Sequence, residues 1–552
     1  MTRPLRWLLP CLLLCTLRVQ AQSEVEGFVM TQLLPDRSLA SPWEMVFGPD
    51  STLWVTERTG KRVQRIDPET GEFDRLVSIP GVFQDAGQDG LLGMALHPEL
   101  GTGTGNDYVY LSYTYQDGGR RQQIVRYTYS ITDNDGTLAD PDTLIDGLPA
   151  SNDHNSGRLI FGPDGLLYYT IGDQGANQFG NRCNPIEAQR LPTQEEVDAE
   201  DWGAYKGKVL RLNTDGSVPD DNPLLEGVRS HVYSYGHRNP QGLVFGPGGK
   251  LYSNEHGPKS DDEVNLIVAG GNYGWPHVAG FQDDSAYAFC DWSSAPDCGD
   301  LRYSDYNCPE GATQTAETAW EAPENFVEPL KALFTVGNDY NFQDSECQAA
   351  FICWPSVAPS SLDYYAPGPD SIPGWGHSLL VVSLKRGAVY RFALSTDRDS
   401  IVSDTMKIWN TQNRYRDIAL HPDGRTFYVA TDPSGQTSGP SGGNTGQLDN
   451  PGTILRFRYE VISTARADAV REPLFTLAPN PAGERVRVRP ADHLTGELYT
   501  VELLDLSGRA LRTYTTGDAE LLLDLNGTAA GMYAVRLTTT RGERHVRRLV
   551  VR

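Results

Sequence analysis

The stretch FGPDGLLYYTIGD (Phe161–Asp173) recurs along the chain, as FGPDSTLWVTER from Phe47, FGPGGKLYSNEHG from Phe245 and LHPDGRTFYVATD from Leu420. In each copy, turn-forming residues separate two runs rich in apolar residues. Pairs such as Asp-Gly and Gly-Gly are strong local signals for a hairpin, because glycine supplies the positive φ that a tight turn needs. Each copy therefore predicts two antiparallel strands of a repeated unit.

Two further stretches extend the repeat to about six units: one begins at Leu96 and has a longer loop, and the other surrounds Trp375. Repeated small antiparallel sheets with little helical periodicity are typical of a β-propeller, whose sheets surround a central channel. We therefore predict an all-β fold, a six-bladed β-propeller of four-stranded antiparallel blades. Residues just before the innermost strands are expected at one mouth of the channel.

Four polar residues precede an apolar-(Gly/His)-Pro turn by eight to ten positions: Gln88, His154, Arg238 and Arg414. A shared offset in a repeated unit places residues at equivalent structural positions. The sequence therefore predicts that these four side chains converge on one site. The alternative is four solvated loop residues with no common role.

The composition fits a large, turn-rich β protein. The 552 residues are 39% hydrophobic, with 56 glycines and 36 prolines, and a chain of this length exceeds one ordinary core. The formal net charge of −25 argues against nucleic acid or an anionic membrane as a partner, because both would repel the protein. The same charge permits a cation such as calcium.

The first 21 residues, MTRPLRWLLPCLLLCTLRVQA, combine Arg3 and Arg6 with an apolar run and end at Ala21. This pattern predicts a signal peptide over residues 1–21, and therefore export. No other stretch reaches the roughly 20 apolar residues of a membrane span. Six cysteines lie beyond the leader, which suits an oxidising compartment, and of these Cys347 and Cys353 are the expected pair.

A change in composition divides the remaining chain. Residues 22–460 carry the propeller repeats, and the polar stretch STARADAVREP indicates a linker over 461–473. Alternating apolar residues then resume, which predicts a small C-terminal β-sandwich over 474–552.

The C-terminal region resembles the sorting domain of the type IX secretion pathway. The matching stretches are LAPNPAGERVRV (Leu477–Val488), VELLDLSGRAL (Val501–Leu511) and GMYAVRL (Gly531–Leu537). The resemblance implies passage through the type IX secretion machinery, followed by release or attachment at the cell surface. The alternative is an ordinary accessory β domain.

Longer motifs in the body carry a second resemblance. They include SNDHNSGRLIFGPDGLLYYTIGDQGANQ, YGHRNPQGLVFGP, EHGPKSDDEVNLIVAGGNYGWP, SLKRGAVYRF and NRYRDIALHPDG. Together they resemble the soluble PQQ-dependent glucose dehydrogenases of the glucose/sorbosone dehydrogenase family, from about Leu39 to Tyr459. The resemblance implies a six-bladed propeller that oxidises an aldose to its lactone with PQQ and Ca²⁺ and passes the electrons to an external acceptor.

The resemblance also implies catalytic and cofactor-binding roles. His154 is the expected general base that removes the hydroxyl proton from the anomeric carbon, and its neighbour Asp153 is expected to orient the ring. Arg238 and Asn239 are expected to contact the quinone oxygens, where a fixed guanidinium stabilises developing negative charge. The carboxylates of PQQ call for cations, and the matching residues are Lys385, Arg414 and Arg416.

Calcium and sugar contacts follow from the same resemblance. Gly257 and Pro258 match positions whose backbone carbonyls bind the calcium of the cofactor. A second calcium pattern maps onto Glu263, Tyr273, Ala279, Phe281, Asp283 and Glu317. The expected sugar contacts are Gln88, Asp153, His154, Gln178, Phe179, Phe351 and Trp354.

The sequence departs from the family around the sugar. Phe351 stands where glucose-active members carry Tyr, and Phe179 replaces a smaller Leu, so we expect a changed sugar preference. The segment from Cys290 to Thr315 follows no pattern of the family. Two alternatives to the dehydrogenase are a calcium-dependent propeller lactonase and a non-catalytic carbohydrate-binding propeller. The preferred sugar, the natural acceptor and homodimer formation stay open.

Overall fold

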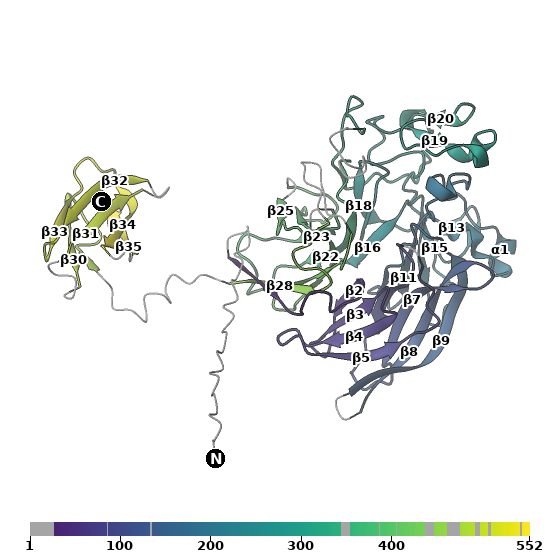
Figure 1. The fold of residues 1–552 in the computed structure, drawn as a ribbon, viewed down its shortest axis with the longest axis horizontal. Helices are drawn as coiled ribbons and strands as arrows, with labels where there is room; N and C mark the ends of the chain where they lie inside the picture. The colour runs from purple at the N-terminus through teal and green to yellow at the C-terminus, as the bar shows by residue number, and fades with distance from the viewer. Residues whose placement is uncertain are drawn as a thin grey trace, which may run out of the picture. The chain divides into compact units, whose positions relative to one another are not determined.

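A computed structural model describes residues 27–85, 87–132, 135–343, 354–385, 387–403, 406–435, 446–460, 475–491, 497–505, 509–540 and 544–552. The predicted signal peptide, the linker, Phe351 and the predicted Cys347–Cys353 pair lie outside these residues. The chain forms two compact units, Met1–Glu460 and Val461–Arg552, which are described separately (Figure 1).

The described part of the first unit contains six four-stranded antiparallel sheets. Taken sheet by sheet, the strands are β2 (Pro42–Phe47), β3 (Leu53–Glu57), β4 (Arg62–Ile66) and β5 (Phe73–Ser78); β6 (Leu91–Leu96), β7 (Tyr108–Gln116), β8 (Arg120–Thr132) and β9 (Asp135–Pro149); β10 (Leu159–Phe161), β11 (Leu167–Ile171), β12 (Lys208–Leu212) and β15 (Val232–Tyr235); β16 (Pro240–Phe245), β17 (Leu251–Glu255), β18 (Asp262–Ile267) and β21 (Lys331–Leu333); β22 (Pro359–Tyr365), β23 (Ser378–Ser383), β24 (Val389–Ala393) and β25 (Met406–Ile408); and β26 (Tyr415–Leu420), β27 (Thr426–Thr431), β28 (Ile454–Tyr459) and β1 (Phe28–Gln32).

Short elements connect these sheets. They are the hairpins β13 (Leu224–Leu225) with β14 (Val228–Arg229) and β19 (Phe289–Asp291) with β20 (Thr313–Thr315), the helix α1 (Gln194–Asp198), and the 3-10 turns Phe179–Asn181, Trp202–Tyr205, Trp292–Ser294, Cys298–Asp300 and Glu317–Ala319.

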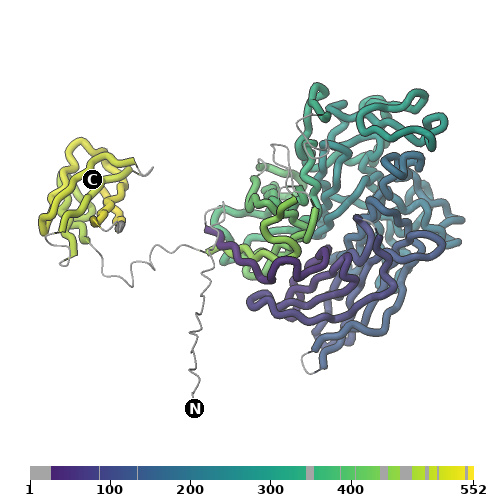
Figure 2. Tube along the Cα trace, in the orientation of Figure 1, coloured from purple at the N-terminus to yellow at the C-terminus, as the bar shows by residue number. Residues whose placement is uncertain are grey.

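The six sheets form a closed ring. The first strand of each sheet contacts the first strand of the next, in the order β2, β6, β10, β16, β22, β26 and back to β2. This cyclic order confirms the predicted six-bladed propeller. The ring is closed by β1, which pairs with β28 from Phe28 opposite Tyr459 to Gln32 opposite Leu455, so that the two ends of the unit share one blade (Figure 2).

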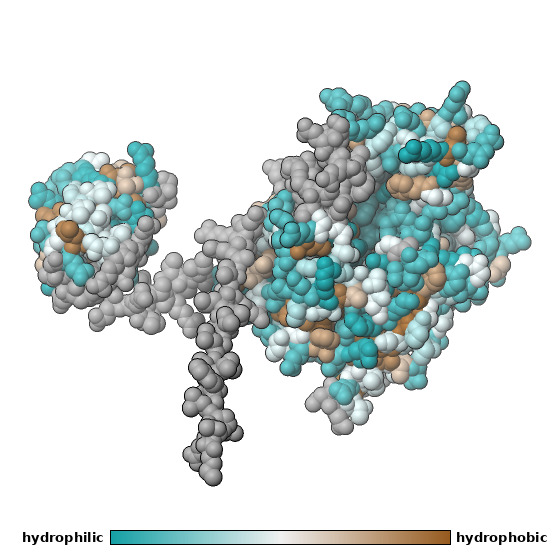
Figure 3. Space-filling model, viewed as in Figure 1, coloured by the Kyte–Doolittle hydropathy of each residue, from teal (hydrophilic) through white to brown (hydrophobic). Residues whose placement is uncertain are grey.

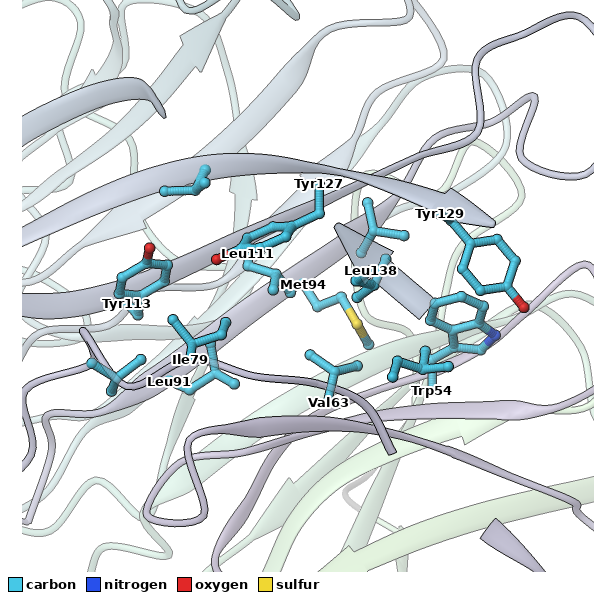
Figure 4. Packing of buried hydrophobic residues seen from close by; sticks show 14 of the residues in the cluster. Trp54, Val63, Ile79, Leu91, Met94, Leu111, Tyr113, Tyr127, Tyr129 and Leu138 are labelled. Carbon is cyan, nitrogen blue, oxygen red and sulfur yellow. The ribbon is translucent and has the colours of Figure 1, made fainter. Parts of the chain in front are cut away.

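Neighbouring blades are held together by apolar side chains. Trp54 and Val63 of one sheet pack against Met94, Leu111 and Tyr127 of the next (Figure 4). Trp54, Val63 and Leu111 are fully buried. Removing such side chains from water is the dominant stabilising term in a fold of this kind. Figure 3 shows a mostly hydrophilic surface on one face of the unit, as expected when apolar residues lie between blades.

A buried ion network joins the inner strands around the axis. Arg158 contacts Glu44 and lies 3.3 Å from Asp417, while its Nε donates to the carbonyl of Gln241 and its other amino group to that of Ser360. These partners lie on four different blades. Burial raises the pKa of Glu44 to about 8, against the opposing effect of Arg158. The network therefore stabilises the closed ring only while its charges remain paired.

The second unit is built from two antiparallel sheets. One contains β29 (Phe475–Ala478), β30 (Arg485–Pro490) and β33 (Leu521–Asp524), and the other contains β32 (Ala510–Thr516), β31 (Tyr499–Leu504), β34 (Gly531–Thr539) and β35 (Arg544–Val551). Val486 and Leu523 of the first sheet share a buried core with Val501, Val535 and Leu549 of the second. Two sheets that share one core form a small β-sandwich.

Two disulfides lie in the first unit. Cys183 is bonded to Cys298, and Cys290 to Cys308. The sequence left the pairing of these four cysteines open. Among the described helices, none is both long and apolar enough to cross a membrane.

Candidate active site

His154 lies in the loop between β9 and β10, before an innermost strand of the ring. Its φ is 45°, in the left-handed region that non-glycine residues seldom adopt. The backbone N–H of His154 donates to Gln88 Oε1 at 3.2 Å and to Asp153 Oδ1 at 3.0 Å. These bonds hold a backbone conformation of a kind that is found preferentially at functional sites.

The His154 ring is oriented by Asp173. Nδ1 of His154 lies 2.6 Å from Asp173 Oδ1, and both residues are buried. The carboxylate of Asp173 also accepts bonds from the indole of Trp275 at 2.8 Å and from the backbone of Gly175 at 2.9 Å. The expectation that Asp153 orients this ring is therefore corrected. The carboxylate that contacts Nδ1 belongs to Asp173, whereas Asp153 lies near Nε2 on the other side of the imidazole.

Asp153 belongs to a polar group on the Nε2 side of His154. Its Oδ1 lies 3.9 Å from Nε2 and accepts a bond from Gln88, while its Oδ2 accepts from Gln178 at 2.9 Å. The amide nitrogen of Gln178 is also 3.3 Å from Nε2. Because the Asp173 carboxylate accepts a hydrogen bond from Nδ1–H, Nε2 is the ring nitrogen that can accept a proton.

Arg238 reaches the same polar group from the turn before β16. One amino group lies 3.3 Å from Gln178 Oε1, and the other donates to the carbonyl of His256 at 3.2 Å. The guanidinium lies over the Trp275 ring at 5.3 Å. Its Nε is buried and has no hydrogen-bond partner among the described residues, so this N–H can donate to a bound molecule. The adjacent Asn239 contacts Gln88 at 3.4 Å.

A group of cations surrounds Asp432. Arg416 donates to its carboxylate at 3.1 Å and Arg414 lies 3.6 Å from it. Burial lowers the pKa of Arg414 and of Arg58, and the charge of Arg416 lowers both further. Lys385, which is also predicted to bind cofactor, donates to the carbonyl of Trp354 at 3.0 Å. Three guanidinium groups beside one carboxylate favour an anionic ligand.

His256 lies beside Arg238, and its carbonyl accepts a bond from an amino group of that arginine at 3.2 Å. Burial lowers the pKa of His256 well below its ordinary value, and the charge of Arg238 lowers it further. Its Nε2 is buried without a hydrogen-bond partner in the part of the chain that the structure describes.

Gly257 and Pro258, the predicted calcium-binding pair, follow His256 directly. Both line a small cavity with Arg238, His256 and Glu255. A side chain at position 257 would meet the carbonyl of Ser260 at 1.9 Å, so this tight loop requires glycine.

The second predicted calcium set is brought together around residues 279–284. Glu317 accepts bonds from the backbone of Ala279 and of Asp284, both at 2.9 Å, and Glu263 accepts from Gly280 at 2.7 Å. Burial raises the pKa of Glu317 to about 7, and the nearby charges of Asp283 and Asp261 raise it further. Crowded buried carboxylates of this kind suit a cation.

Two other members of that set, Phe281 and Tyr273, make hydrogen bonds within the protein. The Phe281 carbonyl accepts a bond from Asp283 N–H at 2.8 Å, and the hydroxyl of Tyr273 is bound to the carbonyl of Leu266 at 2.6 Å. Among the described residues, no three His, Cys, Asp or Glu side chains form a metal-binding group. A calcium ion at either predicted site therefore depends on backbone carbonyls as well as on carboxylates.

Two predicted sugar contacts lie next to tyrosines that the sequence did not single out. The rings of Phe179 and Tyr303 are 5.1 Å apart, and the indole nitrogen of Trp354 donates to the hydroxyl of Tyr306 at 3.3 Å. Phe179 is 55% exposed, so part of its ring is available to a ligand.

Four site residues missed by the sequence analysis share a position in the repeat. Arg58, Asp173, His256 and Asp432 lie eleven or twelve residues after the first residue of the repeated motif, where the second strand of each blade has just ended. The same periodic argument that singled out residues before the first strand would have found them.

Comparisons with known proteins place the two units in families. A model of the family Glucose / Sorbosone dehydrogenase matches residues 39–299 and 334–438, and one of the Secretion system C-terminal sorting domain matches residues 476–552. Quinoprotein glucose dehydrogenase B of Acinetobacter calcoaceticus is 44% identical over 451 residues, which cover 80% of this chain and 93% of that protein.

More distant relatives are also sugar dehydrogenases. Aldose sugar dehydrogenase YliI of Escherichia coli is 27% identical over 74% of this chain and 91% of its own length. The solved PQQ-bound aldose sugar dehydrogenase of Streptomyces coelicolor has a TM-score of 0.51 and 25% identity, covering 78% of this chain and 98% of that one. The chain thus belongs to the glucose/sorbosone dehydrogenase family and ends in a secretion system C-terminal sorting domain.

Proposed function

We propose that the protein is a PQQ- and calcium-dependent dehydrogenase that oxidises an aldose at its anomeric carbon to the lactone and passes the electrons to an external acceptor. The observation that carries this proposal is the buried His154–Asp173 pair, with Nε2 directed to a polar group that includes Gln178 and, through it, Arg238. A base, an orienting carboxylate and a cation then lie around one reacting carbon.

The cations of the site fit PQQ. PQQ carries three carboxylates, and Arg58, Arg414 and Arg416 offer more positive charge than Asp432 neutralises. Arg238 and His256 each keep a buried nitrogen without a partner among the described residues. Arg238, Asn239, Lys385, Arg414 and Arg416 would hold the cofactor. When bound, PQQ supplies a quinone that accepts the hydride from the anomeric carbon.

The residues of this chain then handle the proton and the charge. Nε2 of His154 takes the proton of the anomeric hydroxyl, while Asp173 stabilises the imidazolium that forms. Gln88, Asp153 and Gln178 bind the sugar hydroxyls next to Nε2. Arg238, which contacts Gln178 Oε1, would stabilise the negative charge that develops during the oxidation.

Calcium is proposed at two places. At the first, the carbonyls of Gly257 and Pro258 would bind it beside the cofactor, where a divalent cation can also polarise the quinone. At the second, Glu263, Asp283 and Glu317 would bind it with the carbonyls of neighbouring residues. The raised pKa of Glu317 supports this site, because a cation relieves the repulsion between buried carboxylates.

We further propose that the enzyme acts outside the cell or at its surface. The sorting domain over residues 476–552 supports transport through the type IX secretion machinery. The disulfides Cys183–Cys298 and Cys290–Cys308 suit an oxidising compartment.

Reconstitution tests the proposal. Purified protein is mixed with PQQ and Ca²⁺, and aldose-dependent reduction of an artificial electron acceptor is followed, with Mg²⁺ or a calcium chelator in parallel reactions. We expect reduction that requires PQQ, aldose and Ca²⁺. Hydrolysis of a lactone without sugar oxidation would identify the lactonase instead, and sugar binding without turnover the carbohydrate-binding propeller.

A further inference from the structure

Glu255, the last residue of β17, contacts the turn that carries Arg238. It is buried, and its Oε2 accepts a hydrogen bond from the backbone N–H of Arg238 at 2.7 Å. Its Oε1 lies 3.0 Å from Nδ1 of His237 and accepts from the side chain of Asn265 at 3.1 Å. Both carboxylate oxygens are therefore bound within the protein, and one of them fixes the backbone of a residue of the proposed active site.

The end of β17 holds Arg238 at a second point. The backbone carbonyl of His256, which follows Glu255 in the chain, accepts from an amino group of Arg238 at 3.2 Å. The carbonyl of Arg238 in turn accepts from the backbone N–H of Asp173 at 2.8 Å. The N–H, the carbonyl and the guanidinium of Arg238 are thus each bound, and two of the three partners come from residues 255–256.

The repeated motif contains a glutamate with the same role in another blade. Glu57 ends β3 as Glu255 ends β17, each of them ten residues after the phenylalanine that begins its motif. The Oε2 of Glu57 accepts from the backbone N–H of Ala40. Ala40 and Arg238 each lie two residues before the proline that begins the first strand of the blade. A glutamate at this position therefore fixes the backbone just before an innermost strand.

The two blades differ in the residue opposite the glutamate. Arg62 of β4 lies opposite Glu57 and is paired with it at 2.5 Å. In the other blade Glu263 of β18 lies opposite Glu255, and Asn265 donates to both carboxylates. The place of the arginine is thus taken by a second carboxylate, and the hydrogen bonds of Glu255 go to the turn and to Asn265.

We propose that Glu255 is a positioning residue for the oxidation: it fixes the backbone of the turn at His237 and Arg238, and thereby directs the guanidinium of Arg238 to the place where negative charge develops. A fixed donor stabilises a transition state well, because it needs no reorganisation during the reaction. The proposal rests on the proposed dehydrogenase function, which gives Arg238 its role. Its test therefore includes a readout that does not depend on turnover.

Glu255→Ala removes the acceptor of the Arg238 N–H. We expect kcat and kcat/KM for aldose oxidation at saturating PQQ to fall together by about 10²-fold, because a displacement of about 1 Å at a catalytic group can cost that much and the lost interaction acts in the transition state. Glu255→Gln keeps an oxygen that can accept from Arg238, and it should recover most of kcat. A kcat for Glu255→Ala equal to that of the unaltered protein would overturn the proposal.

Glu57→Ala is the matched control, because it removes the equivalent glutamate from the other blade. The carboxylate of Glu57 contacts Ala40, Arg62 and Gln64, and none of these belongs to the proposed active site. This variant should lose stability, as expected when buried donors lose their acceptor, while kcat stays near that of the unaltered protein. An equal fall in kcat in both alanine variants would overturn the positioning role, because the loss of any buried glutamate would then explain it.

A double-mutant cycle tests whether Glu255 acts through Arg238. Arg238→Ala should lower kcat by about 10²–10³-fold, the usual loss for one donor to developing negative charge. Adding Glu255→Ala should lower kcat no further, because the residue that Glu255 positions is then already absent. Losses that multiply would overturn the proposal. If Glu255→Ala does not fold, Glu255→Asp, which withdraws the carboxylate by one methylene, takes its place in the cycle.

Crystal structures of the full-length variants without PQQ provide the readout that does not depend on turnover. Compared with the unaltered protein, the guanidinium of Arg238 should be displaced by about 1 Å or more in Glu255→Ala, a shift large enough to slow the reaction, and it should keep its place in Glu57→Ala. An unmoved guanidinium in Glu255→Ala would overturn the proposal. A displaced guanidinium, with no aldose oxidised by the unaltered protein, would instead reject the dehydrogenase and leave the positioning role in place.

Discussion

Nδ1 of His154 lies 2.6 Å from Oδ1 of Asp173, and both residues are buried. The two residues come from the loop before β10 and from the end of β11, adjacent strands of one blade. Asp173 is itself fixed by Trp275 and Gly175. The pair therefore presents one imidazole nitrogen to the polar group around Gln178 with a defined tautomer.

His154→Ala should lower kcat for aldose oxidation by about 10²–10⁴-fold, because a well-placed general base contributes that much. The affinity for PQQ should change little, since the cations proposed to hold it are untouched. Steady-state kinetics and fluorescence titration with PQQ measure the two quantities. Wild-type turnover in this variant would remove His154 from the role of base.

Asp173→Asn should lower kcat by at least about 10²-fold while KM changes much less, because the neutral amide neither fixes the tautomer nor stabilises the imidazolium. Asp153→Asn is the matched control: it alters a carboxylate that contacts Gln88 and Gln178 rather than Nδ1, so its main effect should be on KM. A large fall in kcat for Asp153→Asn, with mainly a KM effect for Asp173→Asn, would show that Asp153 orients the ring.

Arg416→Leu should weaken PQQ binding by about tenfold or more, because a charge-assisted bond to a carboxylate is lost. The Tm of the cofactor-free protein should change little, since the lost bond to Asp432 is offset by the relief of repulsion on Arg58 and Arg414. Calorimetric titration and thermal unfolding separate the two effects. A large fall in Tm without loss of PQQ affinity would show a structural role instead.

Arg158→Met should destabilise the propeller by about 3–5 kcal/mol, because it leaves Glu44 and Asp417 as buried carboxylates without their cation. Adding Glu44→Gln and Asp417→Asn to this variant should recover part of the loss. Denaturant unfolding measures both proteins. Equal stability of Arg158→Met and the unaltered protein would mean that the network does not hold the ring together.

Acidification should destabilise the first unit partly through His231. Burial lowers the pKa of His231 to about 4, against an ordinary 6.5. Between these values the unfolded chain binds the extra proton, so stability is full above about pH 6.5 and falls by up to about 3 kcal/mol as the pH drops to about 4.

Thermal unfolding of His231→Gln tests this, because the variant should lose less stability than the unaltered protein between pH 7 and pH 4.5. His421→Gln, which replaces a partly exposed histidine at a repeat turn, is the control and should follow the unaltered protein. The same slope in all three proteins would exclude His231 as the source.

The repeated motif predicted the propeller from local sequence. Alternation of apolar residues sets strands, and turn residues such as Asp164-Gly165 set the hairpins between them, so the first two strands of a blade are encoded in a short stretch. The shared offset also predicted that Gln88, His154, Arg238 and Arg414 converge. The structure brings the first three together around Asp153 and Gln178, whereas Arg414 lies beside Asp432.

Only the tertiary structure decided which groups face each other. Asp153 is next to His154 in sequence, yet the carboxylate that contacts Nδ1 of the ring belongs to Asp173, 19 residues further along the chain. The same holds for Cys183–Cys298 and for Tyr303 against Phe179. Strand patterns depend on neighbours along the chain, whereas contacts across a closed ring depend on where each loop ends in space, which local sequence does not encode.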